Sequence, residues 1–156
     1  MSMRVVLDVV AAVCIGLLVG VEFAVSVFIN PILHKLDSRE ELHAIRLFAS
    51  KLGKVMPYWY VLSLVLLVGE VLIRHRGYGA ALLVTAIGIW VVVIVLTIIF
   101  LVPINNRMTR VNPDVVGYSA HSDLQEHSRW DVMHRWRVVS LTAAMVCFLL
   151  AIIGRA

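Results

Sequence analysis

Four long apolar stretches limit what this chain of 156 residues can fold into. A helix needs roughly 20 apolar residues to cross the hydrocarbon core of a bilayer. Inside lipid every backbone N–H and C=O group must find its partner within the protein, so stretches of this length form helices. The sequence therefore predicts an all-α, integral membrane four-helix bundle forming a single domain, with spans at residues 5–29, 55–73, 78–102 and 136–154.

The composition agrees with a place in the bilayer. Hydrophobic residues make up 61% of the chain and charged residues 15%, far from the average of soluble proteins. We therefore expect a multi-pass protein of the cell membrane, with the lipid bilayer as its main partner. The net charge of +4 fits basic residues that face anionic headgroups, and it indicates no nucleic-acid partner. Cys14 and Cys147 form no Cys-x-x-Cys motif, which excludes a thiol-disulfide enzyme.

Two long connections, residues 30–54 and 103–137, are predicted to lie on one face of the membrane. The short connection at residues 74–77 and both termini then lie on the other face. Ten of the 14 Lys and Arg residues fall on the long-loop face. Because basic residues concentrate in cytoplasmic loops, we expect the long loops to be cytoplasmic. The first span is too long for the core of a signal peptide, so we expect it to be retained.

The first long connection is predicted to contain a helix of its own. Ser38 and Glu41 have the spacing of a capping box, which starts a helix. Apolar residues then recur at helical spacing, which predicts an amphipathic helix at residues 39–52 lying on the membrane or over the mouth of the bundle. We expect Gly53 to end this helix and Pro57 to lie in the first turn of the second span.

The second long connection is predicted to begin at Pro103 and to break at residues 112–113. From about Ser122 a helical pattern runs into the fourth span, which predicts one helix of about 30 residues that projects beyond the bilayer. Residues 28–32 and 101–105 resemble each other, since each closes a span with a proline. Two related helical hairpins would give this pattern, and so would coincidence.

Three carboxylates interrupt the apolar spans. Glu22 lies about two turns inside the end of the first span, too deep to reach water easily. We expect it to face the interior of the bundle and to pair with Arg137 or His134, either as a buried ion pair or as part of a functional site. Asp8 and Glu70 lie near arginines at the opposite face, where helix-end ion pairs are expected.

The approach to the fourth span carries a polar stripe. His127, Trp130, His134 and Arg137 have the spacing i, i+3, i+7 and i+10, which is one face of a helix. The stripe continues into apolar residues of the span, so it is predicted to face the core. The two histidines lie about 10 Å apart along a helix axis, and no third ligand forms a motif, so we predict no metal site.

Further polar residues close the first and third spans on the same face of the membrane. These are Asn30, His34, Asn105 and Asn106. Together with Glu22 and the polar stripe they predict a polar pocket between the helices, of the kind that binds a small molecule.

Several of these motifs occur together in a known family. They are Gly20-Val21-Glu22-Phe23-Ala24, Asn30-Pro31-x-Leu33, Val102-Pro103-Ile104-Asn105-Asn106-Arg107 and Trp130-x-x-x-His134-x-x-Arg137. In these motifs the chain resembles the DUF1772 group, small four-span membrane proteins that include the anthrone oxygenases. The resemblance covers nearly the whole chain.

The resemblance implies a membrane-embedded oxidoreductase, a monooxygenase that converts a small apolar aromatic or polyketide-like substrate with molecular oxygen. An acidic C–H would be deprotonated, and the resulting anion would react with oxygen. His134 is then the candidate base, and Arg137, Asn105 and Asn106 are candidates to hold the enolate oxygen. Glu22 would orient or charge-balance the histidine or the arginine.

The substrate-binding residues expected on this basis are Asn30, His34, Asn105, Asn106, Trp130 and His127. The cofactor stays unknown, since the chemistry can run without one. The alternatives are a metal or haem protein that uses His34, His127 or His134, and a non-catalytic accessory or transport-like protein. A transport pathway would need a homo-oligomer, because four spans enclose little volume.

Overall fold

The computed structural model describes residues 3–74, 78–110 and 121–154. In these residues the chain is almost entirely helical and contains no strand. Four helical runs are long and apolar enough to cross a membrane, which confirms the predicted all-α membrane bundle. They cover Met3–Leu33, Ser38–Ile73, Tyr78–Met108 and Ser122–Ile153.

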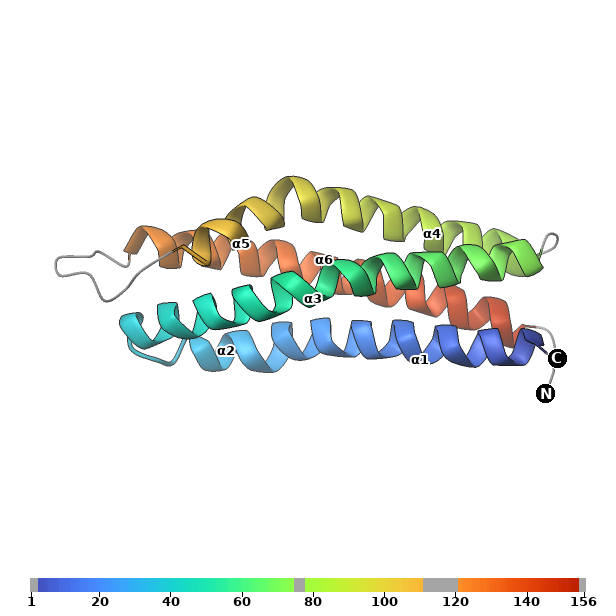
Figure 1. Cartoon of the computed structure of the whole chain (residues 1–156), viewed down its shortest axis with the longest axis horizontal. Helices are drawn as coiled ribbons and strands as arrows, with labels where there is room; N and C mark the ends of the chain where they lie inside the picture. The colour runs from blue at the N-terminus through green and yellow to red at the C-terminus, as the bar shows by residue number, and fades with distance from the viewer. Residues whose placement is uncertain (1–2, 75–77, 111–120, 155–156) are drawn as a thin grey trace.

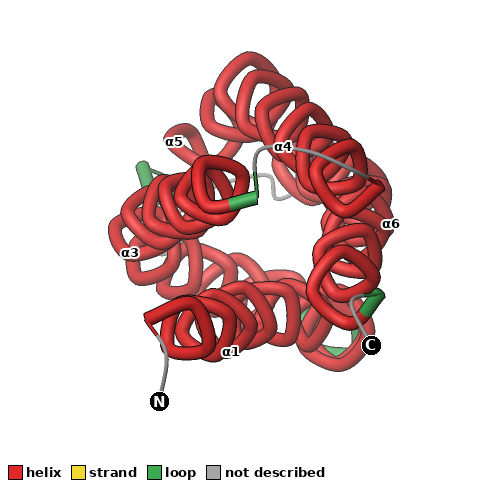
Figure 2. Tube along the Cα trace, turned by 90° about the vertical axis from the view of Figure 1, so that its right-hand side faces the viewer, coloured by secondary structure: helices red, strands yellow, loops and turns green. Residues whose placement is uncertain are grey.

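The four runs pack side by side with their ends roughly aligned (Figure 1). The first contains α1 (Met3–Ala24), a π-helix η1 (Val25–Ile29) and α2 (Asn30–Leu33). The second is α3 (Ser38–Ile73), the third joins α4 (Tyr78–Leu96), a π-helix η2 (Thr97–Leu101) and α5 (Val102–Met108), and the fourth is α6 (His121–Ile153). Viewed along the bundle, they stand in the order α1, α3, α4 and α6 (Figure 2).

Two ends of the bundle differ in character, and we name them by what lies there. The loop end holds α2, the start of α3, α5 and the start of α6, while the terminal end holds the start of α1 and the end of α6 (Figure 1). The predicted helix of about 30 residues at the fourth span is confirmed as α6, which has 33 residues. The break predicted at residues 112–113 and most of the short connection at 74–77 lie outside the described residues.

The first connection is far shorter than predicted, because α3 runs without interruption for 36 residues. Gly53 does not end a helix, and Pro57 lies inside α3 instead of in its first turn. The helix does begin at Ser38, but Asp37 occupies the N-cap position, and the backbone N–H of Glu41 donates to its carbonyl at 2.9 Å. The Glu41 carboxylate does not close a capping box, since it contacts His34 Nδ1 at 2.7 Å.

The helices also continue past the prolines that were expected to close the first and third spans. In each case a π-helix comes directly before the short α-helix that contains the proline. The N–H of Asn30 donates to the carbonyl of Val25, and the N–H of Val102 donates to that of Thr97, both five residues back. Pro31 and Pro103 then fall in the first turn of α2 and α5, where a missing N–H costs little. The similarity of residues 28–32 and 101–105 thus corresponds to a shared local structure.

The half of the bundle nearer the terminal end is a close-packed apolar core. Trp90 is fully buried at its centre, and its indole N–H donates to the carbonyl of Tyr60 at 3.1 Å. The core side chains from all four runs include Ile15, Leu18, Leu67, Leu83, Leu141 and Phe148. A smaller apolar cluster of Leu33, Ile45, Ile104 and Met108 lies at the loop end. The space between these two clusters is where the polar residues gather.

A buried ion cluster lies at the terminal end. Arg74, which is 5% exposed, pairs with both Asp8 and Glu70. The prediction that these two carboxylates form helix-end ion pairs is therefore confirmed. The cluster connects α1 to the end of α3 and places two carboxylates against one cation.

We predict that Arg74→Met lowers the free energy of unfolding by about 3 kcal/mol or more, because it leaves the carboxylates of Asp8 and Glu70 without their cation. The thermal midpoint of purified protein in detergent measures this effect. A suitable control is Arg107→Met, since the Arg107 side chain is 64% exposed in its pair with Glu126 and should contribute at most about 1 kcal/mol. Equal midpoints for the two variants would contradict the prediction.

Candidate functional site

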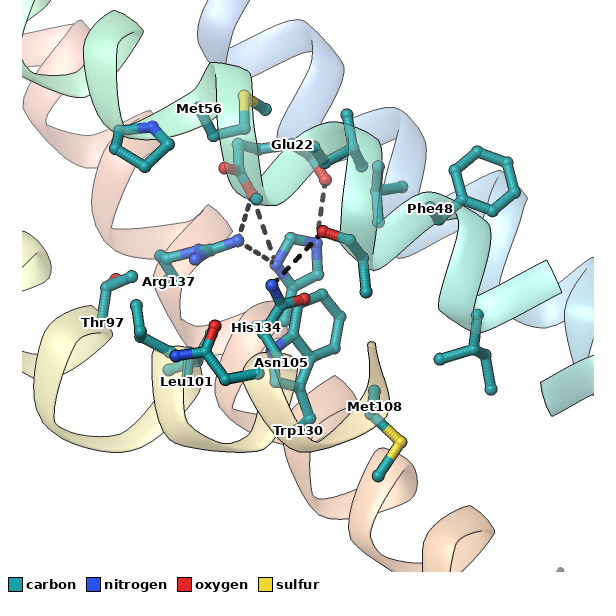
Figure 3. Close-up of a pocket in the computed structure, with 18 of the residues that line it drawn as sticks. Glu22, Phe48, Met56, Thr97, Leu101, Asn105, Met108, Trp130, His134 and Arg137 are labelled. Carbon is teal, nitrogen blue, oxygen red and sulfur yellow. Dashed lines mark hydrogen bonds and ion pairs between the residues drawn. The ribbon is translucent and has the colours of Figure 1, made fainter. Parts of the chain in front are cut away.

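The carboxylate of Glu22 is the centre of the polar region. Glu22 lies on the inner face of α1 and is 1% exposed. Arg137 Nη2 donates to its Oε2 at 2.6 Å, and the hydroxyl of Tyr60 donates to its Oε1 at 2.8 Å. His134 Nδ1 lies 3.3 Å from the same Oε2 (Figure 3). The predicted pairing of Glu22 with Arg137 and His134 is confirmed.

The contacts of His134 define its protonation. Its Nδ1 lies 2.8 Å from Arg137 Nη2, and its Nε2 lies 3.2 Å from the backbone carbonyl of Glu22. A guanidinium can only donate, so Nδ1 must accept and carries no proton, while Nε2–H donates to the carbonyl. The geometry therefore describes a neutral imidazole whose Nδ1 lone pair accepts a hydrogen bond from Arg137.

The polar stripe of α6 faces inward, as predicted. The rings of His127, Trp130 and His134 stack on one another, with centroids 5.6 and 4.7 Å apart and interplanar angles of 13°. Arg137 extends the stripe, with its guanidinium carbon 5.9 Å from the Trp130 ring and 5.8 Å from the Tyr60 ring. Since a helix surface brings residues three and four apart together, the spacing in the sequence produces this stack directly.

A cavity of about 300 Å³ lies beside this stripe, between η1 and α2, α3, η2 and α5, and α6 (Figure 3). Most of its wall is apolar, and the larger apolar side chains include Ile29, Ile45, Phe48, Met56, Leu101 and Met108. The polar side chains that line it are Glu22, Asn30, Tyr60, Thr97, Asn105, Asn106, His127, His134 and Arg137. An apolar chamber with a few polar groups on its wall is the usual form of a small-molecule site.

The predicted substrate-binding residues are brought together in part. Asn105 and Asn106 line the cavity from α5, and Asn105 Nδ2 donates to the carbonyl of Ala49 on α3 at 3.4 Å. Asn30 lines it too, but its Nδ2 donates to Asp131 Oδ1 at 2.6 Å. His34 is not part of the lining, since it is an exposed residue that contacts Glu41, although its ring centroid is 5.9 Å from that of His127.

Three buried polar atoms of the lining residues find no hydrogen-bond partner within the described chain. They are Thr97 Oγ1, His127 Nε2 and Arg137 Nε. Buried polar groups are nearly always paired, so an unpaired group in a cavity wall is available to a ligand or to water. These atoms belong to residues of η2 and of both ends of the stripe on α6, and all three residues line the cavity.

Sequence reasoning missed three polar residues of this region. Tyr60 lies on the buried face of α3 with Ser63 and Glu70, at helical spacing that a search for inward-facing polar residues in the second span would have found. Asp131 is four residues after His127 and belongs to the inner face of α6. Thr97 had no distinguishing signal, because its free hydroxyl depends on a π-helix that the sequence did not predict.

The described residues contain no group of three His, Cys, Asp or Glu side chains placed to hold a metal ion. Cys14 and Cys147 are free thiols on α1 and α6. Cys14 contributes to helix packing through its backbone carbonyl, which accepts a hydrogen bond from Trp59 Nε1 at 3.1 Å.

We predict that Arg137→Met lowers the free energy of unfolding by about 3–5 kcal/mol, because it leaves the Glu22 carboxylate buried without its cation. The double variant Glu22→Gln/Arg137→Met removes both charges and should recover a large part of this loss. Thermal midpoints of both variants and of Glu22→Gln alone complete the cycle. Additive losses in the double variant would show that the two side chains are not coupled.

Comparison with known proteins identifies the family to which this chain belongs. The family model for anthrone oxygenase matches residues 45–147, which is more than half of the chain and includes Tyr60, Asn105 and the stripe of α6. No curated protein and no solved structure matches the chain. The resemblance inferred from the motifs is thus confirmed, and this chain belongs to the anthrone oxygenase family.

Proposed function

We propose that this protein is a membrane-embedded oxidoreductase that oxidises a small aromatic, anthrone-like substrate with molecular oxygen. The observation that carries the proposal is an apolar cavity in which a carboxylate, a guanidinium and a neutral imidazole meet, lined by residues with buried polar atoms that have no partner among the described residues. Family membership supports the type of reaction. The size and apolar wall of the cavity support a flat, largely apolar ligand.

The proposed reaction begins with a proton transfer. The CH₂ group of an anthrone, opposite its ketone, loses a proton to a base and leaves a phenolate-like anion. This anion donates electrons to oxygen and forms a C–O bond, which gives a peroxide at that carbon. Protonation of the peroxide and loss of one water then yield the quinone, so that one oxygen atom enters the product and the other leaves as water. An anion of this kind reacts with oxygen directly, and the proposal assigns no cofactor.

Arg137 is the residue proposed to hold the anionic oxygen. Of its guanidinium nitrogens only Nη2 contacts Glu22 and His134, and the buried Nε has no partner within the described residues. A fixed cation in a site with few competing waters stabilises an anion that forms during the reaction. Asn105 and Asn106, which line the cavity from α5, are proposed as further donors to the same oxygen.

His134 is the proposed base, and its contacts supply a sequence of events. In the ligand-free site the electron pair on Nδ1 accepts from Arg137 at 2.8 Å. When Arg137 turns toward a substrate oxygen, Nδ1 becomes free to take the proton. The imidazolium that forms would be stabilised by Glu22, whose Oε2 lies 3.3 Å from Nδ1. This ordering would couple proton abstraction to substrate binding.

The remaining predicted residues have supporting roles in this proposal. Trp130 and His127 would form the wall against which the ligand packs, and Asn30 would support the inner face of α6 through Asp131. His34 would act only through its neighbour His127. We further propose that the loop end faces the cytoplasm, since ten of the 14 Lys and Arg residues lie on that side.

One observation favours a second candidate. Glu22, Tyr60, His134 and Arg137 are joined by hydrogen bonds across three helices, which is what an interhelical lock in a non-catalytic accessory protein would do. Such a lock depends on the Glu22–Arg137 ion pair and does not require His134 to act as a base. The two candidates therefore differ in what loss of His134 should do.

We predict that His134→Ala lowers the rate of oxygen uptake with an anthrone by about 100-fold or more while the bundle stays folded, because the base is lost and the Glu22–Arg137 pair is kept. Oxygen consumption and the thermal midpoint are measured on the same purified samples. His43→Ala is the matched control, since His43 is an exposed histidine of α3 outside the cavity lining. Full activity in a normally folded His134→Ala protein would refute the base assignment, and no uptake by the wild type would favour the accessory protein.

A further inference from the structure

The hydroxyl of Thr97 differs from three other helical hydroxyls of this protein. Thr85, Ser140 and Thr142 each donate to the carbonyl four residues back, at 2.9–3.0 Å. Thr97 Oγ1 makes no such bond and is buried without a partner in the described residues. Thr97 is the first residue of the π-helix η2 and lines the cavity.

The position of Thr97 in a π-helix is relevant to the role of its hydroxyl. Single π-helical turns inside α-helices are rare and occur frequently at functional sites. Here the turn accommodates Pro103, and it also places Thr97 beside Arg137 in the cavity wall (Figure 3). A hydroxyl can donate and accept, so it can recognise a hydroxyl or a carbonyl oxygen on a ligand.

We propose that Thr97 binds an oxygen substituent of the substrate, next to the oxygen that Arg137 holds. The inference rests on the proposed function and adds to it one residue that would determine specificity for hydroxylated polycyclic ketones. On such a molecule a hydroxyl beside the ketone is adjacent to the oxygen that becomes anionic. Thr97 then distinguishes hydroxylated ligands from bare ring systems.

The test compares two quinones that do not react further. The probes are anthraquinone and a dihydroxyanthraquinone whose hydroxyls flank one carbonyl, bound to protein in lipid nanodiscs. Thr97→Val keeps the shape of the side chain and should weaken the dihydroxy ligand about five- to tenfold, the worth of one hydrogen bond, and leave anthraquinone unchanged. Thr97→Ser should keep the affinity for the dihydroxy ligand.

Thr85→Val is the matched control, because it removes an exposed hydroxyl that already has its partner within the same helical run. Thermal midpoints show that each variant is folded. An equal loss for both quinones, or no loss for either, would overturn the inference and leave the proposed function intact. If the wild type bound neither quinone, the proposed function would fail together with this inference.

A second inference rests on a different observation, the exposure of the cavity wall. The lining residues from η1, α2 and α6 are buried or half-buried. Among the described residues, the exposed ones of the lining belong to α3 on one side and to η2 and α5 on the other, and include Phe48, Val61, Ile98 and Val102, which are 38–61% exposed. The cavity therefore opens sideways, between α3 and the η2–α5 segment.

The surroundings of this opening indicate that it faces lipid. Tyr58 and Trp136 are 80% and 70% exposed, as aromatic residues at the headgroup level are. Trp136 lies between Arg135 and Arg137, and Tyr58 comes one helical turn after Lys54. Val61 comes three residues after Tyr58 on α3, further from the loop end, and Ile98 is followed by the exposed Ile99 and Phe100. Nearer the loop end, the hydrogen bond of Asn105 to Ala49 holds α5 against α3.

We infer that apolar substrates enter this cavity directly from the bilayer, past Val61 and Ile98. The test substitutes a rim residue by tryptophan and follows the binding of the dihydroxyanthraquinone in nanodiscs by its own fluorescence. A narrowed passage slows association and dissociation by the same factor and leaves Kd unchanged, because it alters only the barrier between bilayer and cavity.

Ile98→Trp should show this pattern, and Val61→Trp should repeat it from the opposite rim. The matched control is Ile99→Trp, which changes an adjacent isoleucine of similar exposure, 55% against 61%, that is not part of the lining. Unchanged rates in both rim variants, or equal slowing in the control, would overturn the lateral route. The wild type must bind the dihydroxyanthraquinone for any of these comparisons. If it does not bind, the proposed function fails, whatever the route of entry.

Discussion

The burial of the Glu22 carboxylate is the constraint on which the rest of the loop end depends. A charge at that depth is expensive unless a partner neutralises it, and Arg137 does so from α6 at 2.6 Å. Tyr60 adds a hydrogen bond from α3, and His134 fills the space between cation and carboxylate. Three helices are thereby held at one level, and this level forms the polar floor of the cavity.

The cavity itself follows from how two helices accommodate proline. Pro31 and Pro103 each come just after a π-helix, and both π-helices lie beside the cavity, η1 on one wall and η2 on another. A π-helix is wider than an α-helix and changes the face that the following residues present. Toward the terminal end, where all four runs are regular α-helices, the interior closes into an apolar core around Trp90.

The polar groups of the site divide into two kinds with different consequences. The Glu22 carboxylate is fully engaged within the protein, so it serves the fold whether or not a ligand is present. Thr97 Oγ1, His127 Nε2 and Arg137 Nε have no partner in the described residues. Arg137 belongs to both kinds, since one nitrogen binds the carboxylate while another faces no acceptor. A residue with both roles connects the stability of the bundle to the binding of an anion.

The sequence by itself determined the four spans, the inward stripe of His127 to Arg137 and the partner of Glu22, because each follows from helical periodicity and the cost of a charge in lipid. Only the tertiary structure decided where the helices stop. Proline and glycine often end helices in water but are tolerated inside transmembrane helices, and α3 continues through Gly53 and Pro57. The contribution of Thr97 was out of reach, because it depends on a local widening of the helix that has no signature in the sequence. Helical spacing could have placed Tyr60 on an inner face, but its bond to Glu22 depends on which helix lies opposite.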